Sequence, residues 1–189
     1  ASTSALQQKN AKHLIQSFSD LSYIKNPEST HIISRADGVY IYDNDGKKIL
    51  DSMSGLWCVN MGYGQQSIIE AVNEQMKELV YYNNFFGSSH PSAIKLSEMI
   101  ADKTPEGMNK IYFCGSGSEA NDTVVRLARH YWAARGNKSK SIIISRTNAY
   151  HGSTMAGASL GGMSAMHAQG GLPIADIEHI DQPYYYDAC

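Results

Sequence analysis

The stretch that decides the fold of this chain is IYFCGSGSEAND, residues 111–122. Its four apolar residues, 111–114, predict a short buried strand, and the run 119–135 has the pattern of an amphipathic helix. The Gly-Ser-Gly-Ser turn between them leaves unpaired backbone N–H groups at a helix N-terminus, where the helix dipole favours negative charge. Glycines allow an anion to approach the backbone, and serines add donors. The stretch therefore predicts a phosphate site.

The same turn also fits the dinucleotide fingerprint G-x-G-x-x-G/A at residues 115–120. A dinucleotide site of that kind needs an acidic residue about 20 residues further on, at the end of the next strand. The chain has no Asp or Glu between Asp122 and Asp176, and Arg146 follows the next expected strand, residues 141–145. An NADP-binding Rossmann module, with Arg146 facing the 2′-phosphate, remains open as an alternative.

A second cluster, NAYHGST at residues 148–154, follows the strand expected at 141–145. Strand, helix and strand in this order predict a βαβ unit with a parallel sheet. Ligands of open parallel sheets lie outside the carboxyl ends of the strands, so we expect both clusters to face one ligand. Tyr150 offers a flat face to a planar ring. The two clusters together favour a planar ring that carries one phosphate.

The rest of the chain is expected to contain short helices and short strands. Residues 152–171, rich in Gly, Ser, Ala and Met, predict a loop over the site or a short helix with loops. Hydrophobic periodicity and turn residues predict the other elements. These are a weak helical arm within 5–20, antiparallel strands at 31–34, 38–42 and 47–51, and helices over 65–80 and 92–103.

Composition is that of an ordinary soluble globular protein, with 42% hydrophobic residues, 18% charged residues and a net charge of −2. This balance gives no reason to expect nucleic acid or a membrane as partner. The three cysteines, Cys58, Cys114 and Cys189, are scattered and show no metal-binding spacing. Their odd number argues against a disulfide framework, and no signal peptide is visible, so we expect a cytoplasmic protein without a metal.

The motifs resemble those of a known family. GSGSEAN at 115–121, followed by YHG at 150–152, resembles the class III aminotransferases, pyridoxal 5′-phosphate (PLP) enzymes of fold type I. DSMSGLWC at 51–58 with NMGYG at 60–64 narrows the resemblance to the ω-transaminases of the amine:pyruvate type. The resemblance covers essentially the whole chain. It implies an α/β fold in which residues 1–60 form an arm and a small antiparallel sheet of the small domain. Residues 61–189 would begin the large PLP-binding domain, with its mostly parallel sheet.

The resemblance also implies which residues bind the cofactor. The backbone of Gly117 and Ser118 would hold the PLP phosphate, with Ser116 close by. Tyr150 would stack on the pyridine ring, and His151 would flank it.

For the substrate, the resemblance implies an apolar pocket. Leu56, Trp57 and Tyr150 would line it, and Phe85 would reach it from the partner subunit of a homodimer. Aromatic side chains of this kind suit a hydrophobic amine.

The chemistry of this family needs a lysine that forms a Schiff base with the cofactor and an acid that pairs with the pyridine nitrogen. None of the lysines in this chain occupies a matching motif, and by resemblance both groups lie beyond residue 189. The chain is therefore expected to be the N-terminal portion of a transaminase that moves an amino group from an amine or ω-amino acid to pyruvate or a similar keto acid. Alone it is expected to be inactive. An aminomutase or decarboxylase of the same family remains an alternative.

Overall fold

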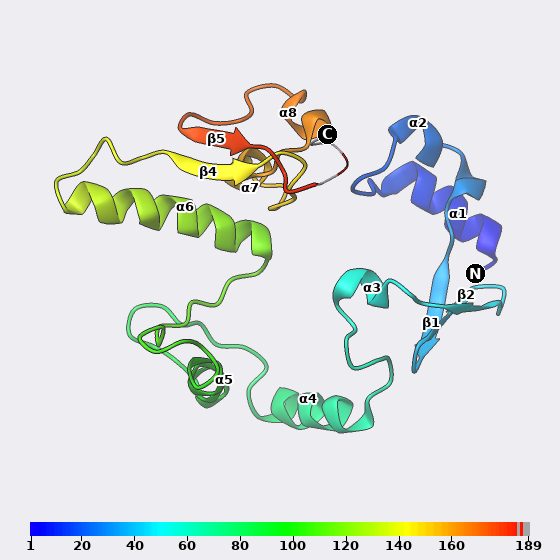
Figure 1. Cartoon of the computed structure of the whole chain (residues 1–189). Coiled ribbons are helices and arrows are strands. Elements are labelled where there is room, and N and C mark those ends of the chain that lie inside the picture. Colours follow the sequence, from blue (N-terminus) through cyan, green and yellow to red (C-terminus); the bar gives the residue numbers. More distant parts are fainter. Residues whose placement is uncertain (185, 187–189) are drawn as a thin grey trace. The chain divides into compact units, whose positions relative to one another are not determined.

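The structure is a computed structural model in which residues 1–184 and 186 are described. The chain forms two compact units, Ala1–His90 and Pro91–Cys189 (Figure 1). The boundary expected between residues 60 and 61 concerns the domains of a longer protein. That division stays a prediction.

The first unit begins with α1, Thr3–His13. Ser2 is its N-cap, because the Ser2 hydroxyl accepts a hydrogen bond from the backbone N–H of Ala5 in the first turn. The expected helical arm is therefore present, but it ends well before residue 20. Two short elements follow, α2 (Leu21–Ile24) and η1 (Pro27–Ser29). Two side chains of α1 bond to the buried Thr30 and so fasten the helix to this region.

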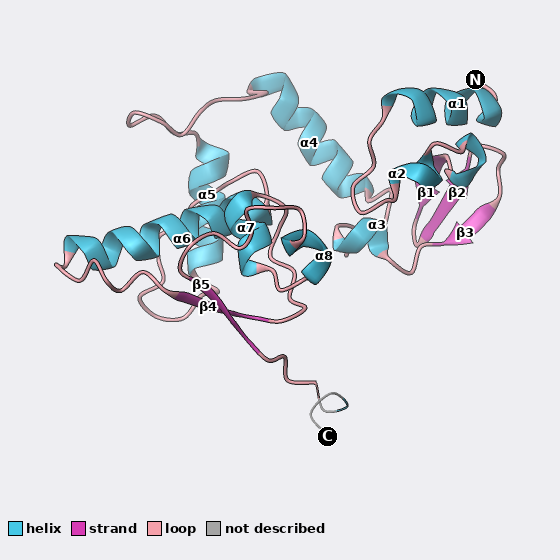
Figure 2. Cartoon of the chain, turned by 90° about the horizontal axis from the view of Figure 1, so that it is seen from above, coloured by secondary structure: helices cyan, strands magenta, loops and turns pink. Residues whose placement is uncertain are grey.

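Three antiparallel strands follow in the order expected from the sequence: β1 (Ile33–Asp37), β2 (Tyr40–Asp43) and β3 (Lys48–Leu50). The turn between β2 and β3 is shaped by Asp43, whose carboxylate accepts the backbone N–H groups of Asp45 and Lys47. Figure 2 shows α1 beside this sheet, and the Thr3 hydroxyl donates a 2.6 Å hydrogen bond to Asp45. The sheet is thus a small scaffold tied to the N-terminal helix.

The segment α3, Ser54–Trp57, is not a right-handed helix. Its four residues all have positive φ, at 48°, 59°, 65° and 64° in chain order. Three of them are not glycine, and each such residue costs about 1–2 kcal/mol in the left-handed region. We call Ser54–Trp57 the left-handed turn. Neighbouring contacts must compensate for its cost.

The two helices expected on either side of the aromatic residues 81–86 are present as α4 (Gln66–Glu78) and α5 (Pro91–Ala101). Neither buries a single residue. The apolar side chains of α4 that produced the helical pattern, such as Ile68 and Val72, are about half exposed. These periodic apolar residues therefore form a helix face that no other described residue covers.

The second unit contains a long helix, α6 (Gly117–Ala134), two parallel strands, β4 (Ile143–Arg146) and β5 (Ile177–Ile180), and two short helices, α7 (Met155–Leu160) and α8 (Ser164–His167). In β4 and β5, Ile143 is paired with Ile177. The small core consists of Val125, Ala156, Leu160 and Ile177, and it joins α6 and α7 to β5. Figure 1 shows the two strands side by side with α7 beside them.

Two expectations for this unit are corrected. Residues 111–114 form no strand, because no described strand pairs with them and a strand needs a partner for its backbone groups. The expected βαβ unit around α6 is therefore not formed as predicted. The parallel pair is instead β4–β5, and its connection runs through α7 and α8, which form in the segment 152–171.

Candidate functional site

The first turn of α6 leaves two backbone donors available. The Ser116 hydroxyl caps the helix by accepting the N–H of Glu119 at 3.1 Å, and the Glu119 carboxylate accepts the N–H of Gly115 at 2.6 Å. These two bonds fix the turn. Among the described residues no acceptor bonds to the N–H groups of Gly117 and Ser118. A Cβ added at Gly117 would meet nothing within 4 Å, so no described atom crowds the turn on that side.

The loop after β4 is joined to this turn by three hydrogen bonds. Ser153 donates its backbone N–H to the Ser118 hydroxyl at 3.1 Å, and Asn121 donates to the carbonyl of His151 at 2.6 Å. The Thr154 hydroxyl also lies 3.4 Å from the Ser118 carbonyl. Because the Ser118 oxygen already accepts a bond, its own proton is available for an anion. The two clusters expected to face one ligand are therefore brought together.

Gly152 lies against Ser118 more closely than any other residue type could. A Cβ at this position would stand 2.8 Å from the Ser118 Cα, and its φ of 124° is one that L-residues rarely adopt. Gly152 is buried. The glycine therefore lets the loop reach the first turn of α6.

Asp122 joins α6 to α7, one helical turn after Ser118. Its carboxylate accepts the Thr154 hydroxyl at 2.6 Å and the backbone N–H of Gly157 at 3.0 Å. Sequence reasoning did not single out Asp122 or Asn121 as positioning residues, although both lie in the deciding stretch. Their spacing of three and four residues from Ser118 puts them on the same helix face, and that signal could have identified them.

Tyr150 and His151 lie in the same loop. Its course is set by Gly162, which accepts from the N–H of Asn148 and donates to the carbonyl of Ala149, both at 3.0 Å. Tyr150 is 54% exposed, and His151 is exposed. About half of the Tyr150 side chain is therefore accessible to solvent.

The other residues expected at the site, those of the substrate pocket, belong to the first unit. Leu56 and Trp57 are 60% and 79% exposed on the left-handed turn, and Phe85 is exposed in a segment without regular structure. The ring of Phe85 lies 6.0 Å from that of Phe86. All three present apolar surface to their surroundings.

Asp51 and Tyr63 bracket the left-handed turn. One carboxylate oxygen of Asp51 accepts both the N–H of Gly55, at 2.8 Å, and the Tyr63 hydroxyl, at 2.7 Å. This Tyr63 hydrogen bond lowers the pKa of Asp51, and the same bond raises the pKa of Tyr63. The other Asp51 oxygen accepts the N–H of Met53.

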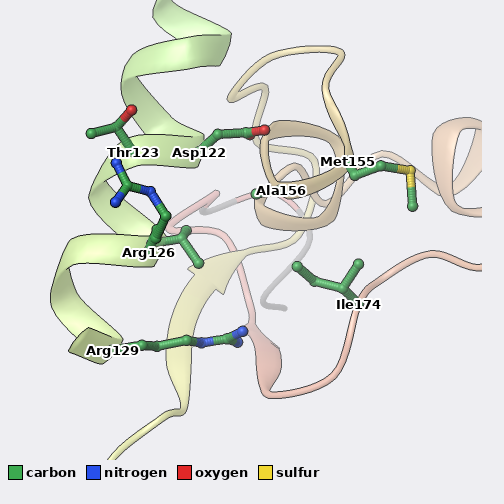
Figure 3. A pocket seen from close by; sticks show the side chains of 8 residues that line it. Asp122, Thr123, Arg126, Arg129, Met155, Ala156 and Ile174 are labelled. Carbon is green, nitrogen blue, oxygen red and sulfur yellow. The ribbon is translucent and has the colours of Figure 1, made fainter. Parts of the chain in front are cut away.

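A groove of about 590 Å³ lies between α6 and α7 (Figure 3). Figure 3 shows Arg126 on α6, Met155 on α7 and Ile174 before β5 around it. The groove includes none of the residues expected to bind the cofactor, so it is a separate feature. The guanidinium of Arg129, which lines the groove, has a structural role, since it donates hydrogen bonds to the carbonyls of Ser141 and Ala175.

Within residues 1–184 and 186, His, Cys, Asp and Glu side chains form no group of three that could hold a metal ion. Among the helices of the described residues, none combines the length and apolar character that crossing a membrane requires.

Comparison with known proteins identifies the family. Residues 23–188 match the model of the class III aminotransferases. The putrescine–pyruvate aminotransferase of Pseudomonas aeruginosa is 52% identical over 186 residues, which are 98% of this chain and 41% of that protein. The diaminobutyrate–2-oxoglutarate transaminase of Halomonas elongata is 41% identical over 82% of this chain and 33% of its own length. The chain therefore spans about two fifths or less of these curated relatives.

Solved structures agree with this assignment. A transaminase from the marine bacterium Virgibacillus superposes with a TM-score of 0.91 at 38% identity, covering 96% of this chain and 41% of its own. The ω-transaminase of Pseudomonas jessenii, solved in complex with PMP, gives a TM-score of 0.91 at 35% identity, covering 96% and 40%. The fold is therefore part of the fold type I α/β architecture of these enzymes. The chain belongs to the class III aminotransferase family.

Proposed function

We propose that this chain is the N-terminal part of a transaminase that moves an amino group from an amine or ω-amino acid to pyruvate or a similar keto acid. Family membership and the 52% identity to a putrescine–pyruvate aminotransferase support this function. The NADP-binding alternative is not favoured, because the relatives are transaminases. Class III aminotransferases depend on PLP, which supplies the electron sink for amino-group transfer when it is bound.

The observation that carries the proposal is the pair of available N–H groups on the first turn of α6. Gly117 and Ser118 would donate these groups to the cofactor phosphate, and the Ser118 hydroxyl would add a third donor. An 18-residue helix adds its dipole at the same place. Ser116 would act close by, through the cap that fixes the turn. The donors and the uncrowded turn fit a phosphate group.

For the ring of the cofactor and for the substrate, we propose the roles expected from the sequence. Tyr150 stacks on the pyridine ring and His151 flanks it, since the loop that contains them is bonded to the phosphate turn. Leu56, Trp57, Tyr150 and Phe85 contact the substrate.

We further propose that the enzyme works as a homodimer, with Phe85 contributed to the partner's pocket, and that it lies in the cytoplasm. Two thiols, Cys58 and Cys114, are free and exposed, a state that a reducing compartment maintains. The exposed apolar faces of α4 and α5 would be covered by the remainder of the enzyme and by its partner subunit. The amine donor and keto-acid acceptor are its small-molecule partners.

The test compares the 189-residue chain with the full-length enzyme that contains it. The full-length enzyme should show a visible cofactor absorption band that an amine donor bleaches, and it should release acetophenone from 1-phenylethylamine when pyruvate is present. The 189-residue chain should do neither step at a measurable rate, because no lysine in it occupies a matching motif. Turnover by the short chain, or none by the full-length enzyme, would contradict the proposal.

A further inference from the structure

The left-handed turn is attached to the rest of its unit by a small number of contacts. Gly55 is the point of closest approach, since a Cβ there would lie 2.9 Å from Val59 and 3.0 Å from the Tyr63 hydroxyl oxygen. The turn closes on itself through the bond from the N–H of Trp57 to the carbonyl of Met53, at 2.8 Å. The Asp51 carboxylate accepts the N–H of Gly55 within the turn, and the Tyr63 hydroxyl donates to the same carboxylate oxygen.

Both of these residues are fixed by their backbones to one place in the sheet. Tyr63 forms an isolated antiparallel bridge with Gly38, with N···O distances of 2.8 and 3.2 Å. Asp51 donates its N–H to the carbonyl of Val39, the residue that follows Gly38, at 3.0 Å. The tight turn between β1 and β2 is therefore the common support of the two side chains. Their hydrogen bond closes a ring that runs from the sheet to the left-handed turn and back.

We infer that Asp51 and Tyr63 are positioning residues that hold the left-handed turn and thereby fix the place of Leu56 and Trp57. This inference rests on the proposed function, in which those two apolar side chains contact the amine substrate. Non-glycine residues in the left-handed region return to the right-handed or extended regions unless their surroundings prevent it. The Tyr63 hydroxyl, which touches no substrate in this scheme, would then control how large an amine the enzyme accepts.

The experiment uses the full-length enzyme with Tyr63→Phe, which removes one hydroxyl and keeps the ring. The matched control is Tyr42→Phe. Tyr42 lies on β2 in the same unit, and its ring packs under Arg35. Two quantities are measured for each variant. One is the hydrogen exchange of the peptide that covers residues 53–59, and the other is the ratio of kcat/KM for 1-phenylethylamine to that for putrescine.

Tyr63→Phe should speed exchange in residues 53–59, where Gly55 donates to Asp51, and Tyr42→Phe should not. The kcat/KM ratio should change by roughly threefold or more in Tyr63→Phe only, with most of the change in KM for the bulkier amine. Asp51→Asn should act in the same direction, because an amide oxygen accepts more weakly than a carboxylate.

Faster exchange with an unchanged substrate ratio would show a merely structural contact and would overturn the inference. Unchanged exchange in both Tyr63→Phe and Asp51→Asn would overturn it as well. A wild-type enzyme without transamination would contradict the proposed function instead, so the two failures are distinguishable.

Discussion

The hydroxyl oxygen of Ser118 accepts a 3.1 Å hydrogen bond from the backbone N–H of Ser153, a residue 35 positions further along the chain. The bond joins the first turn of the longest helix to the loop that follows a parallel strand. Because the hydroxyl oxygen is occupied on the Ser153 side, its proton faces away from that loop. The same serine therefore holds the loop against the helix and, in the proposed site, offers its proton to the phosphate.

Gly152→Ala should damage this junction. The new Cβ would stand 2.8 Å from the Ser118 Cα, and the φ of 124° disfavours a side chain in any case. We expect a loss of about 1–3 kcal/mol in the free energy of unfolding, as for other overpacked positions. We also expect weaker cofactor retention. Thermal unfolding and the cofactor absorbance that remains after gel filtration measure the two effects.

Gly136→Ala is the matched control for that change. Gly136 also has a positive φ, 82°, but a Cβ there would meet nothing within 4 Å. It should lower stability slightly through backbone strain and leave cofactor retention unchanged. Equal retention in the two variants would contradict the role given to the close approach at Gly152.

Asp122→Ala should separate α6 from α7. It removes the acceptor of the Thr154 hydroxyl and of the Gly157 N–H, both partly buried. Each donor then keeps only a longer contact of 3.4 Å, so we expect the loss of the two bonds to the carboxylate to cost about 1–3 kcal/mol. Chemical denaturation of the full-length enzyme measures the change. Asp102→Ala, at an exposed aspartate after α5, is the control and should stay within about 0.5 kcal/mol of wild type.

Tyr150→Ala should weaken cofactor binding by on the order of 1 kcal/mol, since it removes the proposed ring stacking. Tyr150→Phe keeps the ring and should retain most of the affinity. Titration of the apoenzyme with PLP distinguishes the two variants. If both lost affinity equally, the hydroxyl and not the ring face would be the important group.

The Asp51–Tyr63 bond predicts a specific dependence on pH. The lowered pKa of Asp51 means that its stabilising effect is present above about pH 4 and is lost as pH falls through the pKa of the folded state. The raised pKa of Tyr63 means that its effect is present below about pH 10 and is lost as pH rises through its folded-state pKa.

The difference in denaturation midpoint between wild type and Tyr63→Phe should therefore be constant near neutral pH and should shrink at acid pH. A difference that stayed the same down to the acid-unfolding range would show that the two groups do not interact in the folded protein. Tyr42→Phe serves again as the control and should follow wild type at every pH.

Sequence reasoning succeeded where the signal is local. The periodicity of α4, α5 and α6 specifies helices whether or not anything covers them. It failed where structure depends on distant partners. Residues 111–114 read as a strand, yet a strand forms only when another strand pairs with it. Conversely, β5, Ile177–Ile180, was not expected from the sequence, because its four residues include two polar ones and no run of apolar residues precedes it.

The candidate site shows the same division. The glycine-rich turn and the Tyr150 cluster can be recognised as motifs, because their residue types and spacing are typical of ligand-binding loops. The left-handed conformation of Leu56 and Trp57 is not visible in the sequence, since these residue types disfavour it. Sequence alone could identify which residues to expect at the site, but not the contacts that orient them.

Residues 111–114 have a practical consequence for work on this chain. No backbone hydrogen bond joins them to another described residue, and Tyr112 and Phe113 are 70% and 41% exposed. Unpaired backbone beside apolar side chains is a template for intermolecular pairing and aggregation. The 189-residue chain should therefore be poorly soluble when it is expressed alone. Lysine substitution at Tyr112 offers a direct means to keep it in solution.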